Sequence, residues 1–343
     1  MDINIDEFDT TTFSDNDDMI IYSHPHPGRI EWEDYDDDED EDVKKKPKSS
    51  QYMLKDGKYL PVQDTVPKLP AGYYRPELNK YNGEIYAAPK EVVLPKLYDL
   101  PNGLYQELFA DIKHFWESEE RYKKFGNIYK RNILLYSVPG NGKTSLINQI
   151  CQQVINEYDG IVMSIDDEDT LQTYPKLMEM IRQIEPKRKI VTVIEDLERL
   201  IRKDYISSLL LQLLDGQETI PNCLTVCTTN YPEQLGEQYT ARPSRFNLVV
   251  EYKKPDAETR KFYMSQKLID AGVKLDDKIN QNIERYVKET EGFTFDYMKE
   301  FIEMMFVGEV SEKDALKRIN DSIDKKGKYK ATENEPTKVG FGV

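Results

Sequence analysis

A glycine-rich loop between an apolar segment and an amphipathic one constrains this chain more than any other feature. The loop reads Ser-Val-Pro-Gly-Asn-Gly-Lys-Thr over residues 137–144, and the apolar run Ile-Leu-Leu-Tyr precedes it at 133–136. Apolar side chains then recur at helical spacing, at Leu146, Ile147, Ile150 and Val154. A strand that turns sharply into a helix aims backbone N–H groups and a helix N-terminus at one point, where an anion can bind. The pattern therefore predicts a phosphate-binding loop.

Each position of this loop has a chemical task. Gly140 and Gly142 allow the sharp turn, Lys143 can reach terminal phosphates, and the Thr144 hydroxyl can bind magnesium. Ser137 stands where the usual pattern has glycine, so we expect a strained but usable loop. The expected nucleotide-binding residues are Pro139, Gly140, Asn141, Gly142, Lys143, Thr144 and Ser145.

Five short apolar runs alternate with helical segments in the middle of the chain. These runs lie at 133–138, 161–165, 190–194, 223–227 and 247–250. Near-continuous apolar strands separated by helices are typical of a parallel sheet covered on both faces. Residues 256–322 show only helical patterns. The fold class is therefore predicted to be α/β, a P-loop NTPase parallel sheet followed by an all-helical lid subdomain.

Two carboxylates follow the third apolar run, at Glu195 and Asp196. An NTPase needs one carboxylate for the magnesium shell and another that acts on the attacking water. By position, Glu195 is the metal-side residue, paired with Thr144, and Asp196 is the water-side residue. The order is the reverse of the usual aspartate followed by glutamate.

Two further elements follow in the order expected of a ring ATPase. Asn230 ends the fourth apolar run, where its amide can orient the attacking water. Arg242 and Arg245 lie three residues apart further along. They would be surface charges in a monomer, but in a ring they could contact a neighbour's γ-phosphate.

At this point the sequence resembles the AAA clade of AAA+ ATPases, over about residues 105–310. The segments at 136–146, 190–197 and 225–246 carry the resemblance, together with Glu-Gly-Phe-Thr-Phe-Asp at 291–296, which resembles the lid of this clade. The Glu-Asp order and the approach at 115–136 resemble the mitochondrial chaperone that translocates the Rieske iron–sulfur protein. Similar ATPases occur in bacteriophages, and the wealth of Tyr, Lys, Asn and Ile is typical of an AT-rich genome of that kind.

The resemblance implies an ATPase that works as a homo-oligomeric ring, a hexamer, with ATP and Mg²⁺ as ligands. It implies that Lys143, Glu195, Asp196, Asn230, Arg242 and Arg245 take part in catalysis. A protein substrate is expected, so that ATP turnover drives protein remodelling or translocation. ATP in place of GTP also rests on the resemblance, since no guanine-reading Asn-Lys-x-Asp pattern is visible.

Two other functions stay open on the sequence alone. A DNA-metabolism ATPase such as a clamp loader is one, although Ser-Arg-Phe at 244–246 lacks the cysteine that clamp loaders usually have there. An ATP-binding assembly scaffold without turnover is the other. Tyr174 is a further open position, either a pore-loop aromatic that grips substrate or a packing residue of a helix.

Charge divides the chain unevenly. The net charge is -16, and residues 1–50 hold 17 acidic and 5 basic residues, so most of the acidity lies in that segment. A globally basic nucleic-acid binder is thereby disfavoured. The expected organisation is an acidic disordered tail at 1–50, an extended or β-rich lead-in at 51–103, the α/β ATPase subdomain at 104–255, the helical lid at 256–322, and a flexible tail at 323–343.

Location follows from two weaker features. The three cysteines, Cys151, Cys223 and Cys227, show neither disulfide nor zinc spacing, which favours a reducing compartment. The sequence contains no apolar run of the ~20 residues that span a bilayer. We therefore expect a cytoplasmic protein without a membrane partner.

Overall fold

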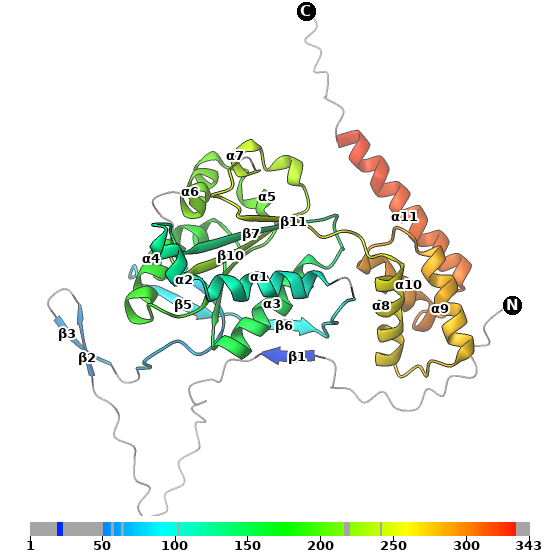
Figure 1. Cartoon of the computed structure of the whole chain (residues 1–343), viewed down its shortest axis with the longest axis horizontal. Helices are drawn as coiled ribbons and strands as arrows, with labels where there is room; N and C mark the ends of the chain where they lie inside the picture. The colour runs from blue at the N-terminus through cyan, green and yellow to red at the C-terminus, as the bar shows by residue number, and fades with distance from the viewer. Residues whose placement is uncertain are drawn as a thin grey trace, which may run out of the picture.

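The computed structural model of the chain (Figure 1) describes residues 19–22, 51–55, 58–62, 65–101, 103–215, 220–240 and 242–333. The remaining residues, which include most of the expected acidic tail, lie outside the described part of the chain.

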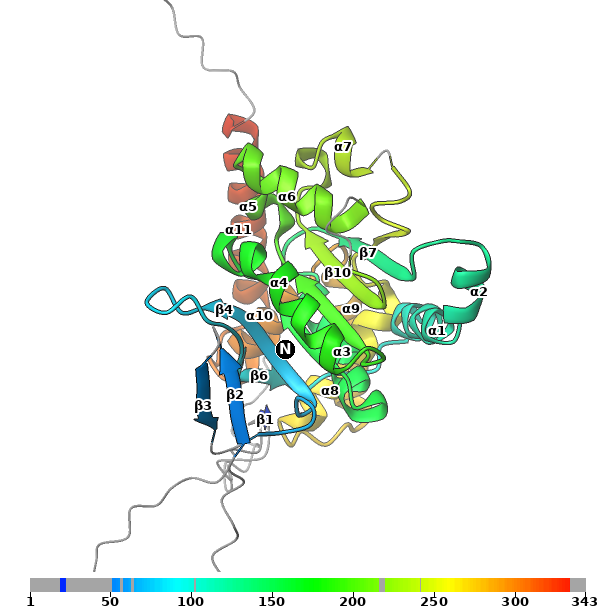
Figure 2. The same cartoon turned by 90° about the vertical axis from the view of Figure 1, so that its left-hand side faces the viewer.

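A seven-stranded sheet forms the centre of the molecule, with the strand order β11-β7-β10-β9-β8-β4-β5. Its strands are β4 (Gly72–Leu78), β5 (Ile85–Pro89), β7 (Lys130–Tyr136), β8 (Ile161–Ser164), β9 (Ile190–Ile194), β10 (Cys223–Thr229) and β11 (Leu248–Glu251). Neighbouring strands are parallel except β4 and β5, which are antiparallel. In Figure 2 the sheet can be followed from β4 through β10 to β7. The predicted parallel α/β sheet is confirmed.

Helices cover both faces of this sheet, and alternate strand residues belong to different cores. Ile133 and Leu135 of β7 pack in one core with side chains of the first helices and the lid. Leu134, between them, packs in the other core, with side chains of α4 and α6. This alternation follows from the two-residue period of a strand. It explains why these strands are apolar almost without interruption.

The helices of the ATPase part are α1 (Leu104–Trp116), α2 (Glu119–Lys124), α3 (Lys143–Tyr158), α4 (Glu168–Ile184), α5 (Leu197–Leu200), α6 (Asp204–Asp215) and α7 (Glu237–Thr240). A 3-10 turn, η2, spans Pro232–Gln234. The lid consists of α8 (Ala257–Asp270), α9 (Asp277–Glu289), α10 (Phe295–Phe306) and α11 (Glu312–Glu333). Figure 1 shows the lid helices grouped at one end of the molecule.

The lead-in shares the central sheet instead of standing apart from it. Strands β4 and β5 form a hairpin whose turn contains Asn82 and Gly83. Strand β4 also pairs in parallel with β8, which places the hairpin at one edge of the ATPase sheet. Within the described part of the chain, strands β2 (Gln51–Lys55) and β3 (Lys58–Val62) pair only with each other.

Three segments differ from the sequence expectations. Apolar spacing compatible with one helix over 104–124 is resolved into two helices, because Ser118 N–H donates to Phe115 O and the chain turns after α1. Within the expected acidic tail, β1 (Met19–Tyr22) pairs with β6 (Val92–Pro95). The composition of residues 1–50 as a whole did not indicate this strand, because its four residues are apolar while the segment around them is acidic. Helix α11 continues to residue 333, beyond the expected start of the C-terminal tail.

Candidate nucleotide-binding site

The glycine-rich loop joins β7 to α3 at the carboxyl edge of the sheet. Gly140 has a φ of 76° and Gly142 a φ of 84°, a conformation that side chains with a Cβ rarely adopt. Helix α3 begins at Lys143 with no side-chain cap, so the N–H groups of its first turn remain available to a ligand. Ser137 does not have a positive φ, and its hydroxyl donates to Val138 O at 2.9 Å. The strain expected from serine is therefore absent.

Lys143 lies at the centre of the site, buried beneath the loop. Its ammonium donates to Ser137 O at 3.1 Å, to Ser137 Oγ at 2.9 Å and to Asn230 Oδ1 at 2.6 Å. Burial lowers the pKa of Lys143, and the neighbouring carboxylates of Asp196, Glu198 and Glu195 oppose that shift. A positive charge is thus held next to the phosphate loop.

The two residues expected to hold magnesium are in contact. The Thr144 hydroxyl donates to Glu195 Oε2 at 2.7 Å, which links the first turn of α3 to the end of β9. Both side chains are exposed. Among the described residues, no group of three or more His, Cys, Asp or Glu side chains could hold a metal alone. One hydroxyl and one carboxylate fit Mg²⁺ bound together with substrate phosphates and water.

Asp196 and Asn230 are also in contact. Asn230 Nδ2 donates to Asp196 Oδ1 at 3.0 Å, and the Asn230 amide oxygen accepts from Lys143. Asp196 has a φ of 49°, unusual for a residue with a Cβ, and its backbone N–H donates to Thr228 Oγ1. Glu195 therefore contacts the threonine of the loop, and Asp196 contacts the amide.

The two arginines have different surroundings. Arg245 is buried, bonds to Asp215 Oδ2 at 3.0 Å and donates to Gln238 O. Arg242 is exposed. The sequence interpretation placed both at a neighbour's nucleotide, but Arg245 would first have to break its ion pair with Asp215. Arg242 is the arginine that the structure leaves accessible to a neighbour.

The lid touches the phosphate loop directly. Asp296 N, at the start of α10, donates to Gly140 O at 3.1 Å, and a Cβ on Gly140 would lie 2.6 Å from Asp296 Oδ2. Asn141 Nδ2 donates to Tyr252 O at 2.7 Å and to Lys253 O at 2.9 Å, just before the lid. Of the expected nucleotide-binding residues, Asn141 therefore uses its side chain to join the loop to the lid.

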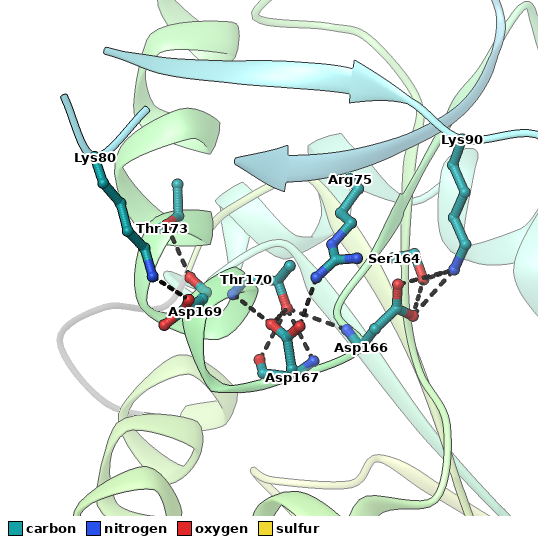
Figure 3. Close-up of polar contacts among 9 residues, drawn as sticks. All are labelled: Arg75, Lys80, Lys90, Ser164, Asp166, Asp167, Asp169, Thr170 and Thr173. Atoms are coloured by element: carbon teal, nitrogen blue, oxygen red, sulfur yellow. Dashed lines mark hydrogen bonds and ion pairs between the residues drawn. The ribbon is translucent and has the colours of Figure 1, made fainter. Parts of the chain in front are cut away.

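A second group of acids lies at the same edge of the sheet, in residues 166–169, which we call the acidic turn. Its first two residues lie between β8 and α4, and its last two begin α4. Each of its four carboxylates pairs with a cation from another part of the chain, and Figure 3 draws the pairs of Asp166, Asp167 and Asp169. These ion pairs are Asp166 with Lys90 at 2.9 Å, Asp167 with Arg75 at 2.5 Å, Glu168 with Lys203 at 2.6 Å, and Asp169 with Lys80 at 2.9 Å. Three of the four cations come from the β4–β5 hairpin and its flank.

Tyr174 lies within α4, not in a loop. Its side chain is 1% exposed, and its hydroxyl shares a hydrogen bond of 2.5 Å with Thr192 Oγ1 of β9. Burial raises the pKa of this tyrosine well above its ordinary value. Of the two interpretations, packing is therefore correct, and Tyr174 does not face a pore.

Sequence reasoning overlooked two residues of the site. Asp296 of the lid contacts Gly140 of the phosphate loop. Residues 291–296 resemble the lid of the AAA clade in sequence, but this resemblance predicted no contact with the loop. Glu198 is buried two residues after Asp196 and contacts the end of β10. A third acid within four residues after an apolar strand was the available signal for Glu198.

Comparison with known proteins agrees with this geometry. Residues 133–254 match the family described as "ATPase family associated with various cellular activities (AAA)". This segment is an AAA domain. It contains the phosphate loop, Glu195, Asp196, Asn230 and both arginines. The resemblance inferred from the sequence is confirmed.

Curated relatives of several kinds match part of the chain. "Probable mitochondrial chaperone BCS1-A" of Dictyostelium discoideum is 28% identical over 185 residues, 49% of this chain and 42% of that protein. "26S proteasome regulatory subunit 4 homolog" of Encephalitozoon cuniculi is 25% identical over 188 residues, 50% of this chain and 44% of that protein. "Cell division cycle protein 48 homolog" of Archaeoglobus fulgidus is 26% identical over 156 residues, 41% of this chain and 21% of that protein. The chain thus spans less than half the length of these relatives.

In the part of the chain that the structure describes, no helix is both long enough and apolar enough to cross a bilayer.

Proposed function

We propose that this protein is an ATPase that hydrolyses ATP with Mg²⁺ and uses the energy to remodel or translocate a protein substrate. One observation carries the proposal. A phosphate loop, a hydroxyl–carboxylate pair and a water-side carboxylate with its amide meet around Lys143, linked by hydrogen bonds of 2.6 to 3.0 Å. These are the parts that phosphoryl transfer to water requires.

The proposed chemistry gives each residue a separate task. The N–H groups at the start of α3 bind the phosphates, and Lys143 balances their charge. Thr144 and Glu195 hold Mg²⁺, which would neutralise charge on the phosphates when bound. Asp196 acts on the attacking water, and Asn230 positions that water. Since Lys143 now contacts Asn230, phosphates that bind Lys143 also change the surroundings of the amide.

Turnover is tested first with Lys143→Ala. We expect a loss of at least about tenfold in turnover, equal to ~1.4 kcal/mol in the barrier, because backbone N–H groups cannot replace the ammonium. Lys274→Ala, an exposed lysine of the lid, is the matched control. A Lys143→Ala protein that keeps more than about a tenth of the wild-type rate would contradict the phosphate-loop assignment. Wild-type protein that binds ATP without turnover would support the scaffold instead.

A protein substrate is supported by the relatives, which include a protein named as a chaperone and one named as a proteasome subunit. The experiment compares ATP turnover with no addition, with an unfolded protein and with single-stranded DNA. Stimulation by the unfolded protein is the expected result. Stimulation by DNA alone would favour the DNA-metabolism alternative.

The proposed active unit is a homo-oligomeric ring, a hexamer, in which Arg242 reaches the nucleotide of the adjoining subunit. The exposed position of Arg242 supports this arrangement. Arg242→Ala and Lys143→Ala subunits are expected to be inactive separately and to recover activity when mixed. Sedimentation with and without ATP measures the assembly. A dilute monomer with constant specific activity would contradict the shared site.

A reducing compartment such as the cytoplasm is proposed on separate grounds. All three cysteines are free and buried. Burial raises the pKa of the Cys151 thiol to about 12, so it is protonated and unreactive at neutral pH.

A further inference from the structure

Glu198 differs from the other carboxylates that follow β9. Glu195 is exposed and Asp196 is partly exposed, whereas Glu198 is only 6% exposed. A buried carboxylate is costly unless hydrogen bonds compensate its lost hydration. Both oxygens of Glu198 are engaged, and both bonds come from the end of β10.

These two bonds fix the chain at Asn230. Glu198 Oε2 accepts from the Thr229 hydroxyl at 2.7 Å, and Oε1 accepts from the backbone N–H of Asn230 at 3.3 Å. The Thr229 hydroxyl in turn accepts from Tyr231 N at 3.0 Å. Strand β10 ends at Thr229, so no ladder bond of β10 holds the backbone of Asn230. The hydrogen bond to Glu198 therefore fixes the backbone of Asn230 in place of a bond to a neighbouring strand.

Asn230 is therefore held from two directions by one short segment. Asp196 accepts from its side-chain amide, and Glu198 accepts from its backbone N–H. Helix α5, a single turn at Leu197–Leu200, fixes the spacing of the two acids. Asp196 and Glu198, which are two residues apart, thus fix the position of the Asn230 amide relative to the Asp196 carboxylate.

We propose that Glu198 is a positioning residue for hydrolysis, which holds Asn230 so that its amide lies between Lys143 and Asp196. This proposal rests on the ATPase activity proposed above. Glu198 acts through Thr229 and Asn230, not on the nucleotide. Glutamine could keep both contacts, because its Oε1 can accept from Asn230 N–H while its Nε2 donates to the Thr229 hydroxyl, which can also accept. Alanine removes both contacts and is therefore the informative substitution.

The kinetic test uses Glu198→Ala, which removes both contacts of Glu198, and Thr229→Val, which removes only the hydroxyl contact. Each is expected to lower kcat by roughly tenfold to a hundredfold through misplacement of Asn230, with ATP affinity changed by less than about twofold because neither residue contacts the nucleotide. In an Asn230→Ala background, Glu198→Ala should add little, since the residue it positions is gone. Glu300→Ala, on the exposed face of α10, is the matched control.

Hydrogen exchange supplies a readout that does not depend on turnover. In protein labelled with ¹⁵N-asparagine, the backbone N–H of Asn230 should be protected in the wild type and exchange faster in Glu198→Ala. Thr229→Val leaves the acceptor of that N–H in place and should lose less protection. If Glu198→Ala fails to fold, Thr229→Val supplies the kinetic test, and the protection of Asn230 in the wild type supplies the exchange test.

The outcomes separate this proposal from the function on which it rests. A wild type without ATP turnover overturns the proposed function, and the Asn230 exchange then decides alone whether Glu198 holds that residue. Unchanged Asn230 protection in Glu198→Ala overturns the positioning role. Equal losses from Glu198→Ala in the wild-type and Asn230→Ala backgrounds overturn it as well, because Glu198 would then act elsewhere.

Discussion

Two groups of acids lie at the carboxyl edge of the same sheet, and they are held in opposite ways. Each carboxylate of the acidic turn at 166–169 pairs with a cation from another element. Glu195 and Asp196 instead accept hydrogen bonds from Thr144 and Asn230. Arg199 lies 3.7 Å from Asp196, and its side chain is 74% exposed, so that pair is weak. Carboxylates without a strong cation partner can receive magnesium and water, whereas paired ones fix the chain.

The two arginines repeat this contrast with the opposite sign of charge. Arg245 is buried against Asp215, and Arg242 is exposed. We therefore propose a structural role for the paired Arg245 and a functional role for the exposed Arg242. The predictions below test this distinction, beginning with the largest expected effect.

Arg242→Ala should lower kcat by about 10³-fold or more, the range for an arginine that stabilises transition-state charge. Its melting temperature should stay that of the wild type. Arg245→Ala should instead unfold more easily, because Asp215, whose side chain is 14% exposed, would lose its ion-pair partner at a cost of up to about 3 kcal/mol. Steady-state turnover and thermal unfolding measure the two effects, with exposed Arg318→Ala as the control. If Arg245→Ala is stable and inactive, the paired arginine has the functional role.

Asp196→Asn should keep ATP binding and lose about 10²-fold or more in kcat, because an amide cannot take the proton of the water. Calorimetric titration with ATP and single-turnover hydrolysis separate binding from chemistry. Asp321→Asn, on an exposed face of α11, is the matched change. Loss of Mg²⁺ dependence in place of turnover would show that the roles of Asp196 and Glu195 are reversed.

Glu195→Gln should raise the Mg²⁺ concentration needed for half-maximal turnover by roughly tenfold, about 1.4 kcal/mol of metal binding. The reason is that the amide keeps one oxygen ligand but loses the charge that attracts the metal. Turnover measured across a Mg²⁺ series gives the shift. An unchanged Mg²⁺ requirement would remove Glu195 from the metal shell.

In the acidic turn, Asp167→Asn should cost less than about 1 kcal/mol of unfolding free energy, since its ion pair with Arg75 is partly exposed to solvent. Asparagine still caps α4, because the Asp167 side chain accepts from Thr170 N. Asp167→Ala should lose that cap as well and cost about 1 kcal/mol more. Urea unfolding measures both variants, and ATP turnover at 25 °C should not change. A loss of turnover in Asp167→Asn would contradict the proposal that the acidic turn has a structural role and only Glu195 and Asp196 act in hydrolysis.

The smallest expected effect is the pH dependence of stability from Asp166. Burial disfavours its charge, but hydrogen bonds from Ser164 and Lys90 outweigh this and lower its pKa below the ordinary 3.8. Its ionised form therefore stabilises the fold fully above the unfolded pKa, and this contribution is lost as the pH falls through the folded pKa. Asp166→Asn should flatten the acid side of the stability curve, measured by urea unfolding from pH 6 downward. An identical slope in both proteins would contradict the shift.

The sequence by itself determined the sheet and the main parts of the site. The five apolar runs became β7 to β11, because a strand buried on both faces must be apolar at nearly every position. The positions of Lys143, Thr144 and the acid pair were predictable for a related reason. They follow strands whose carboxyl ends meet at one edge of a parallel sheet.

Only the tertiary structure decided which of the charged and aromatic residues were free. Arg242 and Arg245 look alike in sequence, and Asp215 distinguishes them from a distance of about thirty residues along the chain. The sequence left open whether Tyr174 is a pore-loop residue or a packing residue of a helix, and its hydrogen bond with Thr192 of β9 decides for packing. Glu198 acquired its role from the end of β10. Burial and partners of this kind come from contacts between distant segments, and local pattern and spacing cannot encode them.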